Sequence, residues 1–242
     1  PQLRDDAVVS HASAAVLHGL PVWSKAIDRV HVTRNGSGGG KRRSLVHVHA
    51  SPLGGGDVTS IGGIPVTSLA RTVLDLCRTL PFEQAVAAGD HALRLGLLAT
   101  ALEEAMTLLE GWPGTRQARR AIAFLDGRSE SAGESVSRVR IHEAGLPAPV
   151  PQREIYGPDG RLVARVDFCW EEQRTVGEFD GKIKYGRLLK PGQSIEDVLF
   201  DEKRREDALR DLGWQIVRWL WADLYRQGVI RDRILRAFAG AA

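Results

Sequence analysis

Hydrophobic and polar positions alternate with a period of two in the second half of the chain. Within residues 161–184, two runs rich in Val, Phe, Trp and Thr flank a short polar break at Glu171–Gln173. This pattern is typical of two strands joined by a turn. The register of the expected hairpin places Asp167 opposite Glu178 and turns Asp180 to the same face. The apolar residues expected on the opposite face are Val166, Phe168 and Trp170.

The three acids of this hairpin point to a cation. Carboxylates on adjacent strands repel one another unless a positive partner neutralises them. Mg²⁺ (or Mn²⁺) binds oxygen ligands and keeps waters, one of which can attack a phosphodiester. Lys182 and Lys184 follow the acids directly and can stabilise developing charge. The alternative is a solvated acidic face with lysines as counter-charges.

Helical periodicity dominates the first half of the chain. A helix is predicted over residues 8–21, with His11 and His18 as capping or packing residues. Short paired strands at 28–33 and 45–49 enclose a basic loop. From a Thr67/Ser68 cap onward the period is again helical, and the pattern restarts after Pro81. The further helices are expected at 85–98, 100–109 and 116–125, with Arg71 and Asp75 as an i,i+4 pair.

The pattern around the hairpin predicts a second domain. A helix over 129–144 carries Glu134, which either joins the acids or closes a capping box with Ser131. A strand at 152–156 precedes the hairpin. A charged helix at 196–212, a strand at 214–219 and a terminal helix from Asp223 follow it. We therefore place the boundary between residues 126 and 127.

Composition permits a nucleic-acid ligand without requiring one. The 242 residues carry a net charge of +3, with 43% hydrophobic and 26% charged residues. No apolar run is long enough for a membrane span, and two cysteines are too few for a disulfide framework, which indicates the cytoplasm. Lys41, Arg42 and Arg43 are candidate phosphate contacts, as are Lys203 and Arg204. The alternative for the first three is an ordinary hairpin loop.

Motifs of the second domain resemble a nuclease family. The chain reads Val166-Asp167-Phe168, then VGEFDG at 176–181 and GWQIVR at 213–218. This resembles the PD-(D/E)XK signature of very-short-patch-repair-like domains, the domain of unknown function 559, over about residues 129–225. The resemblance implies that Asp167, Glu178 and Glu134 bind the metal. The family-wide motif has Lys where this chain has Asp180, so Lys182, Lys184 or Lys203 would have to substitute.

Motifs of the first domain resemble a different family. SHASAAVLHGLP and TSLARTVLDL, within residues 9–98, are similar to AbiEi-type antitoxins. The winged helix that usually precedes these motifs is absent or reduced to a stub in the sequence.

Two functions follow from these resemblances. We expect an α+β antitoxin-like domain (1–126) joined to an α/β restriction-endonuclease-like domain with a mixed central sheet (127–242). The first function is a Mg²⁺-dependent endodeoxyribonuclease that uses Asp167, Glu178, Asp180, Glu134 and a lysine. The second is a non-catalytic DNA-binding antitoxin or regulator with a degenerate nuclease fold. DNA is the expected partner in both, and a cognate toxin is a further candidate. The oligomeric state is left open.

Overall fold

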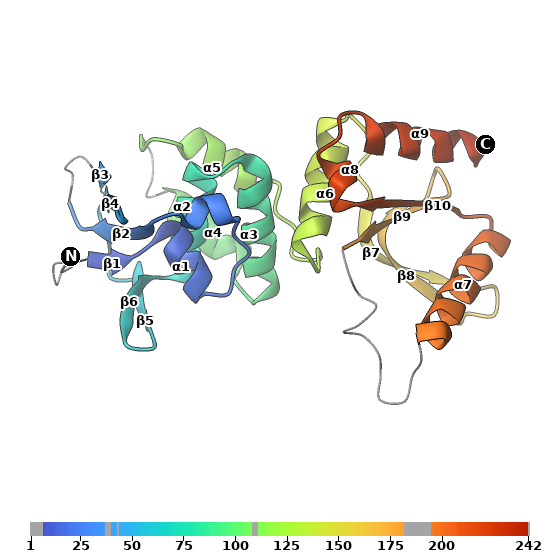
Figure 1. Ribbon diagram of the computed structural model, residues 1–242, viewed down its shortest axis with the longest axis horizontal. Helices are drawn as coiled ribbons and strands as arrows, with labels where there is room; N and C mark the ends of the chain where they lie inside the picture. Colours follow the sequence, from blue (N-terminus) through green and yellow to red (C-terminus); the bar gives the residue numbers. More distant parts are fainter. Residues whose placement is uncertain (1–6, 37–39, 43, 108–110, 182–194, 242) are drawn as a thin grey trace. The chain divides into compact units, whose positions relative to one another are not determined.

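The chain folds as two units, Pro1–Ala132 and Gly133–Ala242, each with its own β-sheet. The computed structural model describes residues 7–36, 40–42, 44–107, 111–181 and 195–241 (Figure 1). The observed division falls after Ala132, at the start of the helix Ala132–Glu143, six residues beyond the boundary expected between residues 126 and 127. No helix among the described residues is long and apolar enough to cross a membrane.

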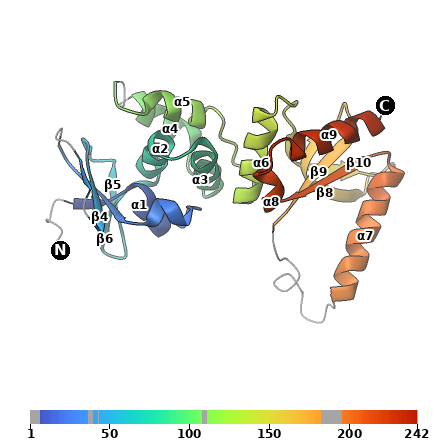
Figure 2. The same cartoon turned by 45° about the horizontal axis from the view of Figure 1, so that its top comes forward.

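The sheet of the first unit has both parallel and antiparallel pairs, in the order β3-β4-β2-β1-β6-β5. Its helices lie to one side of it (Figures 1 and 2). The strands are β1 (Ala7–Val9), β2 (Val30–Arg34), β3 (Lys41–Arg42), β4 (Val46–Ala50), β5 (Val58–Ile61) and β6 (Ile64–Thr67).

One prediction for this sheet is wrong. β2 and β4 pair as expected, but they run parallel, so they are not the arms of a hairpin. The basic segment between them contributes β3, which pairs antiparallel with β4 at the sheet edge. Two parallel neighbours cannot be joined by a tight hairpin turn and need a crossover connection.

The helices of the first unit begin close to the predicted positions. They are α1 (His11–Leu17), α2 (Leu69–Thr79), α3 (Phe82–Arg94), α4 (Ala99–Thr107) and α5 (Thr115–Ile122), with a short 3-10 turn η1 (Ser24–Ile27). Ser68 caps α2 by accepting a hydrogen bond from the backbone N–H of Arg71. Val73 and Leu76 of α2 share the core of this unit with Ala88 of α3.

Arg71 and Asp75 pair as predicted, at 3.1 Å, but inside the unit. Arg71 is only 3% exposed. Its guanidinium also donates to the Asp57 carboxylate at 2.9 Å and to the Ser51 hydroxyl at 2.6 Å. A buried charge is tolerated only when it is paired and hydrogen-bonded. The Arg71 network therefore ties α2 to the segment between β4 and β5.

The second unit has the element order helix, three strands, helix, strand. Its elements are α6 (Ala132–Glu143), β7 (Val150–Tyr156), β8 (Leu162–Trp170), β9 (Thr175–Asp180), α7 (Ile195–Asp211), β10 (Gln215–Leu220), α8 (Trp221–Leu224) and α9 (Val229–Gly240). The sheet order is β10-β9-β8-β7. Only β9 and β10 are parallel. Figure 1 shows α6 and α9 on one face of the sheet and α7 on the other.

The predicted hairpin is confirmed, since β8 and β9 pair antiparallel around a turn at 171–174. The predicted apolar face is wrong for one residue. Phe168 stacks on Trp219, whose indole N–H bonds Ser137 of α6. Val166 instead packs with Cys169 and with Leu209 of α7. The alternation of side chains in β8 therefore breaks at Asp167, between the two groups.

Candidate carboxylate site

Three predicted acids come from three elements of the second unit. Glu134 is in the first turn of α6, Asp167 is in β8, and Glu178 is in β9. A glycine allows α6 to approach β9, because a Cβ at Gly133 would overlap the ring of Phe179. Glu134 and Glu178 are each only 7% exposed. Buried carboxylates require hydrogen-bond or ionic partners, and the partners differ between the two.

Gln152 connects Glu134 to Asp167. Its Nε2 lies 2.9 Å from Oε2 of Glu134 and 3.3 Å from Oδ1 of Asp167. The second oxygen of Asp167 accepts a 2.8 Å hydrogen bond from the backbone N–H of Phe179. Asp167 is thus fixed from β7 and from β9. The side-chain amide of Gln152 therefore links α6 to the sheet by hydrogen bonds.

The backbone of Gln152 is unusual for a residue with a side chain. Its φ is +51°, in the left-handed region that favours glycine. The neighbouring pairs Pro151–Phe168 and Arg153–Val166 follow one register, which puts Gln152 opposite Asp167. Such strain costs about 1 kcal/mol or more and persists where the surroundings fix it. The strained residue sits where the acids meet, which makes this position a functional candidate.

Glu178 is neutralised by two arginines. Its Oε1 lies 2.9 Å from Arg205 of α7, and its Oε2 lies 3.0 Å from Nε of Arg218 of β10. Arg218 is the residue paired with Glu178 in the parallel register of β9 and β10. Guanidinium–carboxylate contacts of this length are charge-assisted hydrogen bonds. Both oxygens of Glu178 are therefore engaged on the α7 side of the sheet.

Arg218 is the centre of a larger ionic network. It also contacts Glu202 at 3.2 Å and Glu206 at 3.1 Å, both on α7. Burial lowers the pKa of the Arg218 guanidinium, but the charges of Glu178, Glu206 and Glu202 outweigh it and raise the pKa above its ordinary value. A hydrogen bond from Arg210 is the main reason why the pKa of Glu206 is lowered. The network fixes α7 against β9 and β10 through charge.

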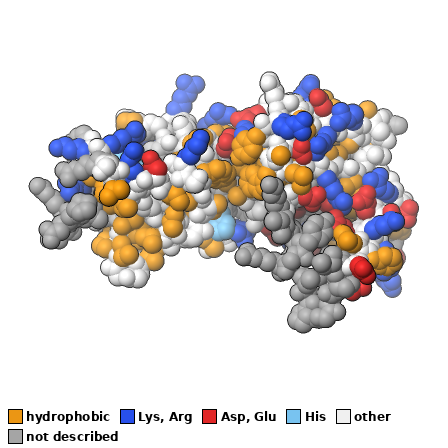
Figure 3. Space-filling view, in the orientation of Figure 1, with side chains coloured by type: hydrophobic (Ala, Val, Ile, Leu, Met, Phe, Trp, Pro, Cys, Tyr) orange, Lys and Arg blue, Asp and Glu red, His pale blue; other side chains and the backbone are white. Residues whose placement is uncertain are grey.

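The remaining predicted site residues are dispersed. Asp180 is exposed at the end of β9, and Lys203 and Arg204 are exposed on α7. Lys41 and Arg42 are exposed in β3 of the other unit. The predicted Lys182, Lys184 and Arg43 lie outside the described residues. On the face seen in Figure 3, basic and acidic side chains of the second unit are interspersed.

The structure brings Glu134 and Asp167 together through Gln152 and gives Glu178 separate partners. Among the described residues, one group of at least three His, Cys, Asp or Glu residues has its potential ligand atoms within 4.8 Å of one another, and it contains none of these acids. It consists of His31, His47 and His49. The metal-ligand role of the carboxylates stays a prediction.

Sequence reasoning missed three residues that position the acids: Gln152, Arg205 and Arg218. Arg218 has a signal, because it closes the GWQIVR motif on the strand next to Glu178. The acids at 202 and 206 are one helical turn apart, which indicates one face of α7. For Gln152 the sequence offers no signal, since its position depends on its unusual backbone angle.

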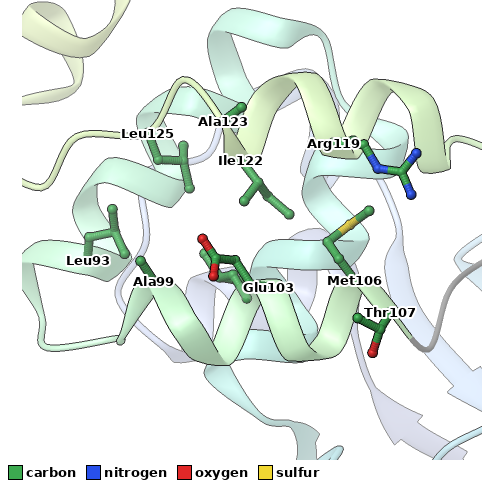
Figure 4. A pocket seen from close by; sticks show the side chains of 10 residues that line it. Leu93, Ala99, Glu103, Met106, Thr107, Arg119, Ile122, Ala123 and Leu125 are labelled. Carbon is green, nitrogen blue, oxygen red and sulfur yellow. The ribbon is translucent and has the colours of Figure 1, made fainter.

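An apolar cavity of about 370 Å³ lies between α4 and α5 in the first unit (Figure 4). Its walls include Leu102, Met106 and Ile122, and the charged Glu103 and Arg119 also line it. No acid of the carboxylate site takes part in it.

Comparison with known proteins places this two-unit α/β chain among bacterial relatives. It is 30% identical over 232 residues to the uncharacterized proteins MT2308 and Rv2248 of Mycobacterium tuberculosis. Each match covers 95% of this chain and 80% of the relative. The chain therefore belongs to the same family as these proteins. No family model matches the chain, and no solved structure matches it.

Proposed function

We propose that the Gly133–Ala242 unit is a metal-dependent endonuclease that hydrolyses DNA phosphodiesters, with Asp167 at its centre. The observation that carries the proposal is the meeting of Glu134 and Asp167, from a helix and a strand, on one amide N–H donor of Gln152. The succession of α6, β7, β8, β9, α7 and β10 is also the order expected of a restriction-endonuclease-like core.

The donors at this point suit a hard cation. The carboxylate oxygens of Asp167 and Glu134 are the ligand type that Mg²⁺ and Mn²⁺ take. The shared Nε2 of Gln152 marks the point where a positive partner fits between the two acids. A metal ion bound there would supply Lewis acidity and lower the pKa of a bound water.

The chain's own residues then have distinct roles. Asp167 is oriented by the Phe179 N–H, so its free rotation is restricted before any ligand arrives. Glu178 is the third proposed ligand, and it becomes available only if Arg205 or Arg218 turns away. Arg205 would then be free to hold a DNA phosphate, for which guanidinium groups are well suited. Asp180 occupies the position that is lysine in the PD-(D/E)XK motif. Lys182 and Lys184, which follow it in the sequence, are proposed to stabilise the negative charge that develops during hydrolysis.

A second function is favoured by a specific observation. Both oxygens of Glu178 are paired with arginine, and the lysine of the motif is replaced by Asp180. If these ion pairs persist, Glu178 cannot bind a metal ion, and the unit would bind DNA without cleaving it. In that case the chain acts as a DNA-binding antitoxin or regulator.

A plasmid-nicking assay with the full chain separates the two functions. Wild type is incubated with Mg²⁺, Mn²⁺ or EDTA, and beside it Asp167→Asn and the control Asp159→Asn. Asp159 is an exposed turn residue whose Oδ1 accepts the Arg161 N–H, a bond that asparagine keeps. The endonuclease proposal expects cleavage by wild type and by Asp159→Asn, blocked by EDTA, with a loss of at least about 100-fold in Asp167→Asn.

A different result of the same assay would refute the endonuclease proposal. If wild type leaves duplex, single-stranded and mismatched DNA intact with Mg²⁺, Mn²⁺ and Co²⁺, but still retards DNA in a gel, the binding function replaces the endonuclease proposal.

A further inference from the structure

Three histidines on neighbouring strands of the first unit form a cluster apart from the carboxylate site. His31 is in β2, and His47 and His49 are in β4. In the parallel register His31 is the direct partner of His47, and His49 follows two residues later on the same face. The ring centroids are 5.1 Å apart for His31 and His47, 3.9 Å for His47 and His49, and 5.2 Å for His31 and His49.

The ring nitrogens of this cluster converge. One nitrogen of each ring lies within 4.8 Å of the corresponding nitrogens of the other two. Tetrahedral ligands about 2.0–2.1 Å from a zinc ion are about 3.3 Å from one another. His31 Nδ1 and His49 Nε2 are already 3.0 Å apart. With a nitrogen of His47 also within 4.8 Å, the three rings can supply three of the four ligands of a tetrahedral site.

The cluster can release its nitrogens to a metal ion. The hydrogen bond between His31 Nδ1 and His49 Nε2 involves one ring proton, and that proton leaves or moves to the other nitrogen of its ring when both nitrogens bind the metal. In the part of the chain that the structure describes, neither ring nitrogen of His47 has a protein hydrogen-bond partner. All three side chains are half-buried, so solvent reaches the cluster. Three protein nitrogens and one position open to water are the arrangement of an open zinc site.

His11 contacts the cluster through the ring of His49. Its ring stacks on that of His49 with centroids 3.5 Å apart and nearly parallel planes, at 11°. The Nδ1 of His11 lies 3.0 Å from the Ser10 hydroxyl, so its ring is held in turn. Groups that orient a ligand without touching the metal sharpen affinity. His11 is thus a positioning residue for His49.

We propose that His31, His47 and His49 bind one divalent transition-metal ion of the zinc class. Imidazole suits Zn²⁺, Ni²⁺ and Cu²⁺, whereas Mg²⁺ takes oxygen ligands. Arg42 pairs with His47 across the β3–β4 ladder and adds positive charge, which Asp28 partly offsets. This positive charge favours water or an anion, rather than a second cation, at the fourth position.

The test is metal titration of the full chain, purified with a chelator and then freed of it. Zn²⁺ binding is measured by competition with a chromogenic chelator, and Co²⁺ binding by visible absorption. The variant is His47→Asn, and the matched control is His142→Asn, an exposed histidine of α6 in the other unit. Asp167→Asn is included to separate this site from the proposed nuclease site.

Wild type, His142→Asn and Asp167→Asn should each bind one Zn²⁺ per chain with equal affinity, and His47→Asn should bind at least about 100-fold more weakly. His31→Asn, with circular dichroism as the check of folding, should show the same loss of tetrahedral Co²⁺ absorption. Equal affinity in wild type and His47→Asn, or a Zn²⁺ site lost in Asp167→Asn instead, would overturn the proposal.

Discussion

The ion pair between Glu178 and Arg218 should carry a measurable coupling energy. The Glu178 side chain is 9% exposed, the Arg218 side chain is 31% exposed, and Nε and Oε2 are 3.0 Å apart. Two unit charges about 4 Å apart attract by about 4 kcal/mol at an effective dielectric constant of 20. Desolvation of the carboxylate cancels part of this, and the exposure of Arg218 weakens it further. We expect a net coupling of about 2 kcal/mol.

A double-mutant cycle measures this coupling directly. The free energy of unfolding in urea is obtained for wild type, Glu178→Gln, Arg218→Met and the double variant. The control cycle is Asp159→Asn with Arg161→Met, an exposed pair at 3.5 Å whose coupling should be near zero. The buried coupling should also persist in about 1 M salt, because screening acts mainly on exposed charges. A coupling below about 0.5 kcal/mol for Glu178 and Arg218 would refute the view that this pair holds β9 to β10.

Two further predictions concern the first unit. Neutralising Lys41, Arg42 and Arg43 together to Ala should weaken DNA binding and reduce its salt slope, because fewer counterions are released; unchanged affinity and slope in gel-shift titrations would leave β3 a structural edge only. Burial, helped by the charges of His47 and His31, lowers the pKa of His49 to about 3 from an ordinary value of 6.5. Between these two pKa values His49 is protonated in the unfolded chain but neutral in the folded chain. The free energy of unfolding, measured with a chelator present, should therefore fall as the pH drops below 6.5. The fall should be less than about 1.4 kcal/mol per pH unit, because this is one partly exposed histidine. A urea midpoint for the first unit that is the same at pH 7 and pH 5 would contradict this.

The sequence is most informative where structure depends on neighbours in the chain. The hairpin at 162–180 and the helix capped by Ser68 are confirmed, because side-chain alternation and a cap are local properties. The strands at 7–9, 58–61 and 64–67 were not predicted, and the pairing of β2 with β4 was taken for a hairpin. Strand direction depends on contacts between distant residues, which a short window of sequence does not contain.

In the candidate site, too, the sequence predicts the local elements but not the contacts between distant residues. Asp167 and Glu178 lie on the predicted strands, and the helix with Glu134 reaches the sheet as expected. The partners that decide their chemistry come from elsewhere: Gln152 from β7, Arg205 from α7 and Arg218 from β10. The histidine cluster carries a visible signal, since VHVHA and VHV alternate in two strands. Its meaning depended on the parallel register, which places His31 beside His47.

The three-residue strand β1 has a topological consequence for the sheet of the first unit. β1 lies between β2 and β6, with Val8 paired to Thr33 and Val9 to Val66. Among the described strands, β1 alone joins β2, on the side of the sheet that holds the histidines, to β6, which leads into α2. A chain without residues 7–9 would present two open strand edges where there was one continuous sheet, and open edges promote association between chains.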